Sequence, residues 1–150
     1  MKRKKIILWS LGILLLAGSA GGYYAWKEYN RQHRDTADLK ADYSASALSL
    51  LEEFGKNEQA SHTRYLGKVL KVQGQVKELL KDEKGFFSVV LGDSTAMSSV
   101  RCSMDSLHNQ EAASLLKGDK VTVQGICTGY NADELLGSDL VLTRSVIFKD

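Results

Sequence analysis

Histidine and cysteine are scarce in this chain of 150 residues, which contains three His and two Cys. His33, His62 and His108 are far apart in the sequence, and none lies within metal-ligand spacing of a cysteine. A zinc site needs such residues at short, regular spacings. The sequence also lacks the G-x-S-x-G elbow, the phosphate-binding glycine loop and the H-E-x-x-H motif. We therefore expect a protein that is not an enzyme and holds no metal or cofactor.

Most of the chain also lacks an excess of basic residues. From residue 60 to residue 150, 11 Lys and Arg are balanced by 11 Asp and Glu. The overall charge of +2 therefore comes from the first part of the chain. Because nucleic-acid affinity depends largely on basic residues that neutralise phosphates, this balance disfavours nucleic acid as a partner.

The longest apolar run, Ile6–Trp26, directly follows the basic residues Lys2, Arg3, Lys4 and Lys5. As a helix, these 21 residues would be about 31 Å long, which matches a hydrocarbon core of roughly 30 Å. We expect a single transmembrane helix that contacts membrane lipid. The preceding cations favour a cytoplasmic N-terminus, so the remainder of the chain is expected outside the cytoplasm.

A cleaved signal peptide is the alternative interpretation of this run. Ile6–Ala17 would be its apolar part, and Gly18–Ala20 would provide the small residues of a cleavage site. We favour a retained anchor because Tyr23, Tyr24 and Trp26 stand where aromatic residues gather at a membrane interface. Both interpretations predict export, and no cysteine follows the run that could carry a lipid.

The sequence predicts four parts: an anchor over 1–26, a tether over 27–42, a helix over 43–60 and a barrel over 61–150. The helix is predicted from apolar residues at three- and four-residue steps, and Gly55 and Asn57 mark its end. We expect this helix to pack on the barrel rather than to bind a partner. The apolar positions are Leu39, Tyr43, Ala47, Leu50, Leu51 and Phe54.

After Tyr65 the apolar period becomes two, which is typical of half-buried strands. Three strands, a helix capped near Asp105 and two further strands follow. This order predicts a mainly β fold, the five-stranded OB-fold barrel. Gly74 and Gly125 are expected where strands bend to close it. The predicted strands centre on 70–76, 87–91, 100–104, 121–127 and 140–148.

Several short motifs together resemble the tRNA_anti-like family of bacterial OB-fold proteins. They are Phe54–Glu58, Tyr65–Val69, Val72–Val76, Lys117–Asp119 and Val121–Tyr130. The resemblance covers about Ala45 to the C-terminus and implies an OB-fold, often preceded by a membrane or export segment. With the topology above, it implies a bacterial inner-membrane protein with an extracytoplasmic or periplasmic domain. Where the family pattern has a third cysteine, this chain has Ser145.

Cys102 and Cys127 both fall on strand faces that we expect to point inward. Export makes a disulfide chemically feasible. The third and fourth strands of such a barrel are not direct neighbours, however, which argues against a bridge. Two interpretations therefore stay open, a disulfide and a pair of buried thiols.

Two hypotheses for function remain. In the first, the domain is a membrane-anchored binding module whose ligand is an envelope protein, peptide or polysaccharide. In the second, it binds nucleic acid, which an OB-fold does with a basic groove and aromatic stacking residues. The candidate ligand-binding residues are Lys71, Gln73, Lys77, Phe86, Arg101 and Tyr130.

Overall fold

The computed structural model describes residues 18–28, 35–133, 135 and 137–148. It divides into two units, Met1–Arg34 and Asp35–Asp150. In the first unit, residues 18–28 are helical and exposed. Within the described part of the chain, no helix is long and apolar enough to cross a membrane. The first 17 residues of the predicted anchor lie outside the described residues.

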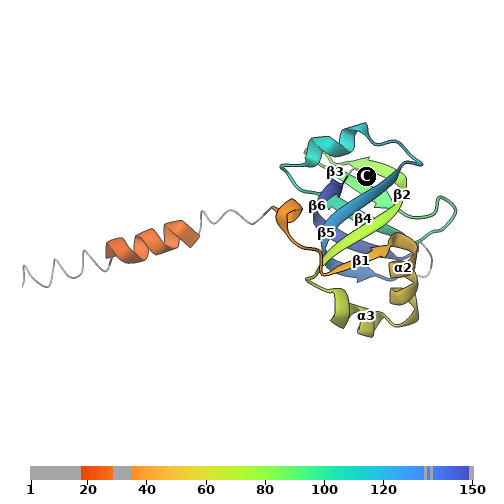
Figure 1. Cartoon of the computed structure of the whole chain (residues 1–150), viewed down its shortest axis with the longest axis horizontal. Coiled ribbons are helices and arrows are strands. Elements are labelled where there is room, and N and C mark those ends of the chain that lie inside the picture. Colours follow the sequence, from red (N-terminus) through yellow and green to blue (C-terminus); the bar gives the residue numbers. More distant parts are fainter. Residues whose placement is uncertain (1–17, 29–34, 134, 136, 149–150) are drawn as a thin grey trace, which may run out of the picture. The chain divides into compact units, whose positions relative to one another are not determined.

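The second unit is built on a closed barrel of five strands (Figure 1). β2 (Val69–Lys81), β3 (Phe87–Leu91) and β4 (Ser99–Met104) form an antiparallel meander. β4 pairs in parallel with β6 (Asp139–Phe148), which pairs with β5 (Lys120–Asn131), and β5 closes the barrel against β2. The predicted number and order of barrel strands are confirmed.

β2 is shared between two parts of the barrel wall. Its first half pairs with β5 from Val69 to Gln75, and its second half pairs with β3 from Val76 onward. Gly74 lies where the partner changes. A Cβ atom on Gly74 would lie 3.1 Å from the Cβ atoms of both Ala47 and Leu91. Glycine at this position therefore allows the close approach that closure requires.

The predicted helix over 43–60 is wrong in its first turn. Tyr43–Ser46 form a strand, β1, that pairs in parallel with β2. The remaining residues form two helices, α2 (Ala47–Lys56) and α3 (Glu58–Tyr65). Asn57 separates them, and its side chain accepts a hydrogen bond from Ala60 N at the start of α3.

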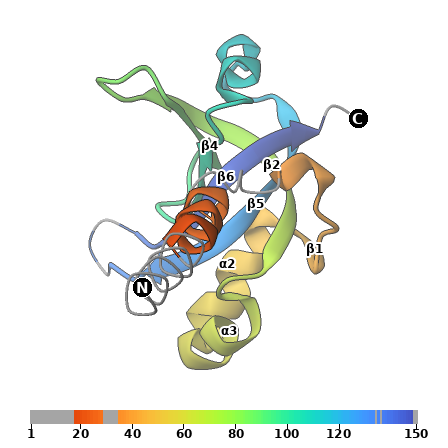
Figure 2. The ribbon, with the colours of Figure 1, turned by 90° about the vertical axis from the view of Figure 1, so that its left-hand side faces the viewer.

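α2 packs on the barrel as predicted. Leu50 and Phe54 are each 1% exposed, and the Phe54 ring stacks on Tyr130 with 4.8 Å between centroids. Figures 1 and 2 show α2 and α3 at one end of the barrel and η2 (Asn109–Ser114) at the other. η2 is a short 3₁₀ helix within the region where the sequence predicts a longer one.

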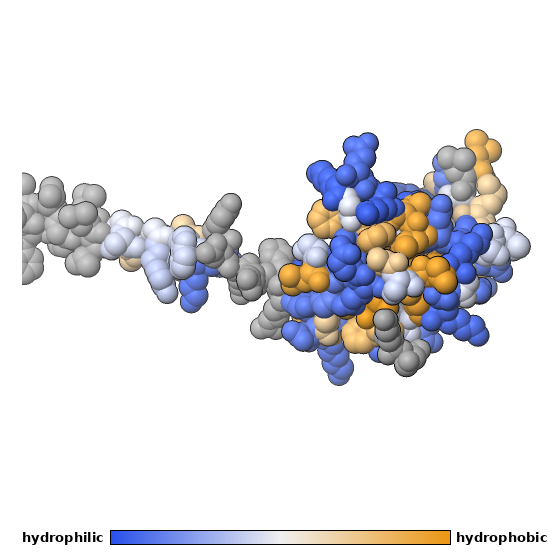
Figure 3. Space-filling view, turned by 90° about the horizontal axis from the view of Figure 1, so that it is seen from above, coloured by the Kyte–Doolittle hydropathy of each residue, from blue (hydrophilic) through white to orange (hydrophobic). Residues whose placement is uncertain are grey.

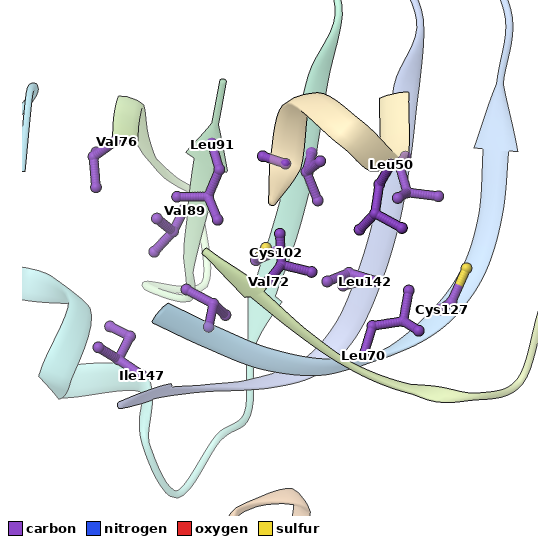
Figure 4. Close-up of a cluster of buried hydrophobic side chains, with 14 of the residues drawn as sticks. Leu50, Leu70, Val72, Val76, Val89, Leu91, Cys102, Cys127, Leu142 and Ile147 are labelled. Carbon is purple, nitrogen blue, oxygen red and sulfur yellow. The ribbon is translucent and has the colours of Figure 1, made fainter. Parts of the chain in front are cut away.

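The barrel core follows the predicted two-residue alternation. Most inward positions of the five strands are apolar and buried, and Figure 4 shows several of these side chains converging between the strands. The strand residues of the core include Leu70, Val72, Val76, Val89, Leu91, Val100, Cys102, Met104, Val123, Cys127, Leu140, Leu142 and Ile147.

Residues 35–42, which include η1 (Thr36–Asp38), contact the outer side of β5. The Gln124 side-chain amide donates to Thr36 O and Leu39 O, both at 2.7 Å, and is 3% exposed. Thr122 on the same strand is 1% exposed. The two-residue period of β5 would leave both residues on a solvated outer face. Both are buried instead, and the N-terminal segment covers Gln124.

A histidine joins this segment to the η2 region. His108 Nε2 lies 2.7 Å from Asp35 Oδ2, and His108 Nδ1 lies 2.8 Å from Glu111 Oε1. Arg144 and Asp105, which pair with each other at 3.5 Å, add further charges nearby. Hydrogen bonds from the imidazole to Glu111 and Asp35 raise the pKa of His108. The Ala37 N–H and His108 lower the pKa of Asp35.

Replacing His108 with Gln should change how stability depends on pH. Because its pKa is raised in the folded state, His108 contributes fully below its unfolded pKa, and this contribution is lost as pH rises through the folded pKa. As pH rises above the ordinary histidine pKa of about 6.5 and through the raised folded-state pKa, wild-type stability should therefore fall relative to His108→Gln. Urea denaturation at several pH values measures this difference. A difference that stays constant with pH would contradict the role of the imidazolium.

Candidate functional site

A pocket of about 380 Å³ lies beside the start of α2 in the barrel domain. We call it the α2 pocket. It lies where β1 ends and β3 leaves the sheet, next to the point at which β2 changes partners. Its volume is within the range of small-molecule sites. The lining residues are Ser46, Ala47, Leu48, Gln73, Gly74, Gln75, Gly92, Asp93, Lys120, Val121 and Thr122.

The polar groups of the α2 pocket are set by the pairing of β2 with β5. Gln73 pairs with Thr122, and Gln75 pairs with Lys120. The Gln75 side chain donates to Gly118 O at 3.0 Å, which fixes its amide next to Lys120. Asp93 adds a carboxylate from the loop after β3. The pocket thus combines amides, hydroxyls and one charge of each sign with the apolar side chains of α2 and β5.

Asp93 is ionised at neutral pH. Its Oδ1 atom accepts hydrogen bonds from Thr95 N at 2.8 Å and from the Thr95 hydroxyl at 2.7 Å. The Thr95 N–H contributes most to a lowered pKa of Asp93, followed by the Thr95 hydroxyl. The pocket therefore contains a carboxylate under physiological conditions.

The three cations proposed as ligand contacts all have partners within the domain. Lys71 Nζ lies 4.7 Å from the centre of the Phe148 ring. Lys77 Nζ donates to Ala96 O at 2.6 Å and supports the loop after β3. Arg101 pairs with Asp139 at 3.0 Å. These side chains stabilise neighbouring structure, and none of them lines the α2 pocket.

The two predicted aromatic contacts do not form one platform with these cations. Phe86 lies in the turn before β3 and is 41% exposed. Tyr130 lies on β5, where its ring stacks on Phe54 at the α2 end of the core. Of the six candidate residues, only Gln73 lines the α2 pocket. Sequence reasoning missed Asp93 and Lys120, although the alternation of β5 places Lys120 on the same face as Thr122.

The net charge of the domain, like the scattered cations and aromatic residues, does not favour a nucleic-acid site. Residues 35–150 contain 17 Asp and Glu against 13 Lys and Arg, a formal charge of −4. Figure 3 shows one face with hydrophobic side chains in its middle and hydrophilic side chains around them. The domain therefore lacks the net basic character that nucleic-acid-binding domains usually have.

Cys102 and Cys127 are free and buried. Both are in register with Leu142, Cys102 from β4 and Cys127 from β5, so β6 separates them (Figure 4). Two strand spacings amount to about 10 Å, whereas a disulfide needs Cα atoms within about 7 Å. The disulfide interpretation is therefore not supported. Burial raises the pKa of Cys102 to about 12 and also raises the pKa of Cys127. Both cysteines act as small core side chains.

The described residues contain no group of three His, Cys, Asp or Glu side chains that could hold a metal ion. The strand order and the closure of the barrel define an OB-fold domain. The chain belongs to the tRNA_anti-like family, whose model matches residues 1–141. This confirms the family resemblance found in the sequence.

Several solved structures are similar to this chain at low sequence identity. One is a "putative nucleic acid-binding lipoprotein" from Klebsiella pneumoniae, with 19% identity and a TM-score of 0.57, covering 79% of this chain and 100% of that chain. An asparaginyl-tRNA synthetase from Entamoeba histolytica matches at 15% identity and a TM-score of 0.40, covering 56% of this chain and 21% of the synthetase. No curated protein matches the chain.

A third similar structure is the replication factor A related protein from Methanobacterium thermoautotrophicum. It matches at 15% identity and a TM-score of 0.37, covering 55% of this chain and 81% of that protein. Of these three, the Klebsiella pneumoniae structure has a TM-score above 0.5, and at 19% identity its likeness extends to the fold alone. The function of this chain therefore has to be argued from its own residues.

Proposed function

We propose that this protein is a membrane-anchored, extracytoplasmic binding module that holds a polar envelope ligand in the α2 pocket and catalyses no reaction. The observation that carries the proposal is the mixed lining of the pocket. Gln73 and Gln75 offer uncharged donors and acceptors, and Lys120 and Asp93 offer one charge of each sign. Such a lining suits a peptide or a glycan better than a polyanion, because Asp93 would repel phosphates.

The first part of the sequence supports the proposed location in the membrane. The apolar run Ile6–Trp26 follows four basic residues, and Tyr23, Tyr24 and Trp26 are 64%, 71% and 61% exposed. Exposed aromatic side chains beside an apolar run suit a membrane–water interface. We place the N-terminus in the cytoplasm and the barrel domain outside it, at the inner membrane of a bacterium.

Nucleic-acid binding is the second candidate, favoured by the described function of the Klebsiella pneumoniae relative. Against it stand the charge of −4 over residues 35–150 and the internal partners of Lys71, Lys77 and Arg101. An OB-fold that binds single strands normally provides a basic groove with several aromatic side chains. We therefore favour the envelope ligand.

Reporter fusions at Asp150 test the proposal. Alkaline phosphatase fused there should be active because it requires export, and green fluorescent protein should remain dark. The purified chain should not raise the anisotropy of a labelled oligothymidylate of about 12 nucleotides at physiological salt. A fluorescent, phosphatase-negative C-terminus together with oligonucleotide binding would replace the proposal with the nucleic-acid function.

A further inference from the structure

The lining of the α2 pocket narrows the class of ligand. None of the described residues that line it is aromatic. Nucleotide bases gain about 1–3 kcal/mol each by stacking on aromatic rings in OB-fold sites. The apolar face of a sugar ring also lacks an aromatic partner in this pocket. A ligand recognised mainly through hydrogen bonds and charge fits the lining better.

Gln73 and Gln75 supply the hydrogen bonds. They lie on the same face of β2, two residues and therefore about 7 Å apart. The Gln75 nitrogen donates one N–H to Gly118 O, which leaves its carbonyl oxygen as an acceptor. Gln73 is exposed and offers both a donor and an acceptor. A backbone amide of a peptide presents the same pair of groups in complementary form.

The two charges lie on opposite sides of Gln75. Lys120 is its partner on β5. On the other side, Gly92 N donates to Gln75 O at 3.0 Å, and Asp93 is the next residue. Two strand spacings separate these flanking chains, a distance of about 10 Å. An extended peptide spans about 3.3–3.6 Å per residue, so three residues cover this distance.

We propose that the α2 pocket binds a short peptide with free termini, about three residues long, whose ammonium group faces Asp93 and whose carboxylate faces Lys120. Its amides contact Gln73 and Gln75, and one small side chain packs against Leu48 and Val121. This inference rests on the proposed function, because it specifies the ligand of the same pocket.

Tri-alanine with free termini is a suitable probe of the full chain in detergent micelles. Titration of ¹⁵N-labelled protein should shift the backbone amides of Gly74 and Gly92 and the side-chain amides of Gln73 and Gln75. Lys120→Ala should weaken binding about tenfold, because a charge-assisted hydrogen bond is lost. Asp93→Asn should weaken it similarly. The matched control is Lys84→Ala in the exposed turn before β3, which should leave the affinity unchanged.

Tri-alanine with an acetylated N-terminus and an amidated C-terminus separates charge recognition from general binding. Capping removes both charged termini, so this peptide should bind about a hundredfold more weakly, and Lys120→Ala should not weaken it further. Equal binding of free and capped peptide, or no shift at concentrations on the order of 10 mM, would overturn the proposal. A spectrum of wild-type dispersion confirms that each variant is folded.

Two further probes distinguish failure of this inference from failure of the proposed function. If chitotriose shifts the same amides and tri-alanine does not, the peptide assignment fails and the envelope-binding function stands. If oligothymidylate binds and the fusions at Asp150 report a cytoplasmic domain, the proposed function and the peptide assignment both fail.

Discussion

Replacing Phe54 with Ala should lower the free energy of unfolding of the barrel domain by about 3–5 kcal/mol. Phe54 is 1% exposed and packs against Tyr130, His62 and Tyr65. Removing its ring leaves a cavity between α2, α3 and β5. Domains of this size are stable by only about 5–15 kcal/mol, so the variant should be marginally folded. Urea denaturation followed by circular dichroism measures the change, because both tryptophans precede the domain.

The matched control for Phe54→Ala is Leu66→Ala. Leu66 follows α3 and is 50% exposed, so its truncation should change stability by no more than about 0.5 kcal/mol. A loss below about 1 kcal/mol for Phe54→Ala would show that α2 contributes little to the core. Such a small loss would also argue against α2 as a rigid wall of the α2 pocket.

Replacing Gly125 with Ala should destabilise the domain by about 1–3 kcal/mol through overpacking. A Cβ atom at this position would lie 2.6 Å from Ser145 Oγ, 3.1 Å from Leu142 Cβ and 3.3 Å from Thr143 O. The neighbouring β6 backbone cannot move away without breaking its pairing with β4 and β5. Gly129→Ala on the same strand is the control. Nothing lies within 4 Å of a Cβ atom there, so its stability should be unchanged or slightly higher.

A double variant identifies the contact that causes this loss. The Ser145 hydroxyl is buried without a hydrogen-bond partner among the described residues. Its removal in Ser145→Ala should therefore be neutral or stabilising. Gly125→Ala combined with Ser145→Ala should recover much of the lost stability, because the shortest contact is gone. No recovery would assign the strain to Leu142 and the Thr143 carbonyl instead.

The barrel could be predicted from the sequence because its strands obey a local rule. Apolar residues alternate along most of each barrel strand, and those positions form most of the core. The start of the N-terminal helix could not be predicted in the same way. Leu39, Tyr43 and Ala47 follow one another at helical four-residue steps, yet Tyr43 pairs with Leu70 on β2. The β2 main chain, distant in sequence, decided the structure of Tyr43–Ser46.

The site was less predictable because its polar residues depend on tertiary partners. Lys71, Lys77 and Arg101 each look like available cations in the sequence, and each is engaged by a residue at least 19 positions away. Gln124 is polar and in an outward register, yet residues 35–42 cover it. Gln73 was found because it alternates outward on β2. Asp93 lies in a loop, where no sequence periodicity predicts which way its side chain points.

The position of β2 has a consequence for how the domain folds. Barrel closure pairs Val69 with Ile126 and Gln75 with Lys120, residues that are 57 and 45 positions apart. Contacts of such long sequence separation slow folding, because loop closure has to precede them. For the exported chain that we propose, β2 leaves the translocation channel well before its closing partner. The barrel therefore cannot close until β5 has also crossed the membrane. Until then the polypeptide remains unfolded, which is the form that a translocation channel accepts.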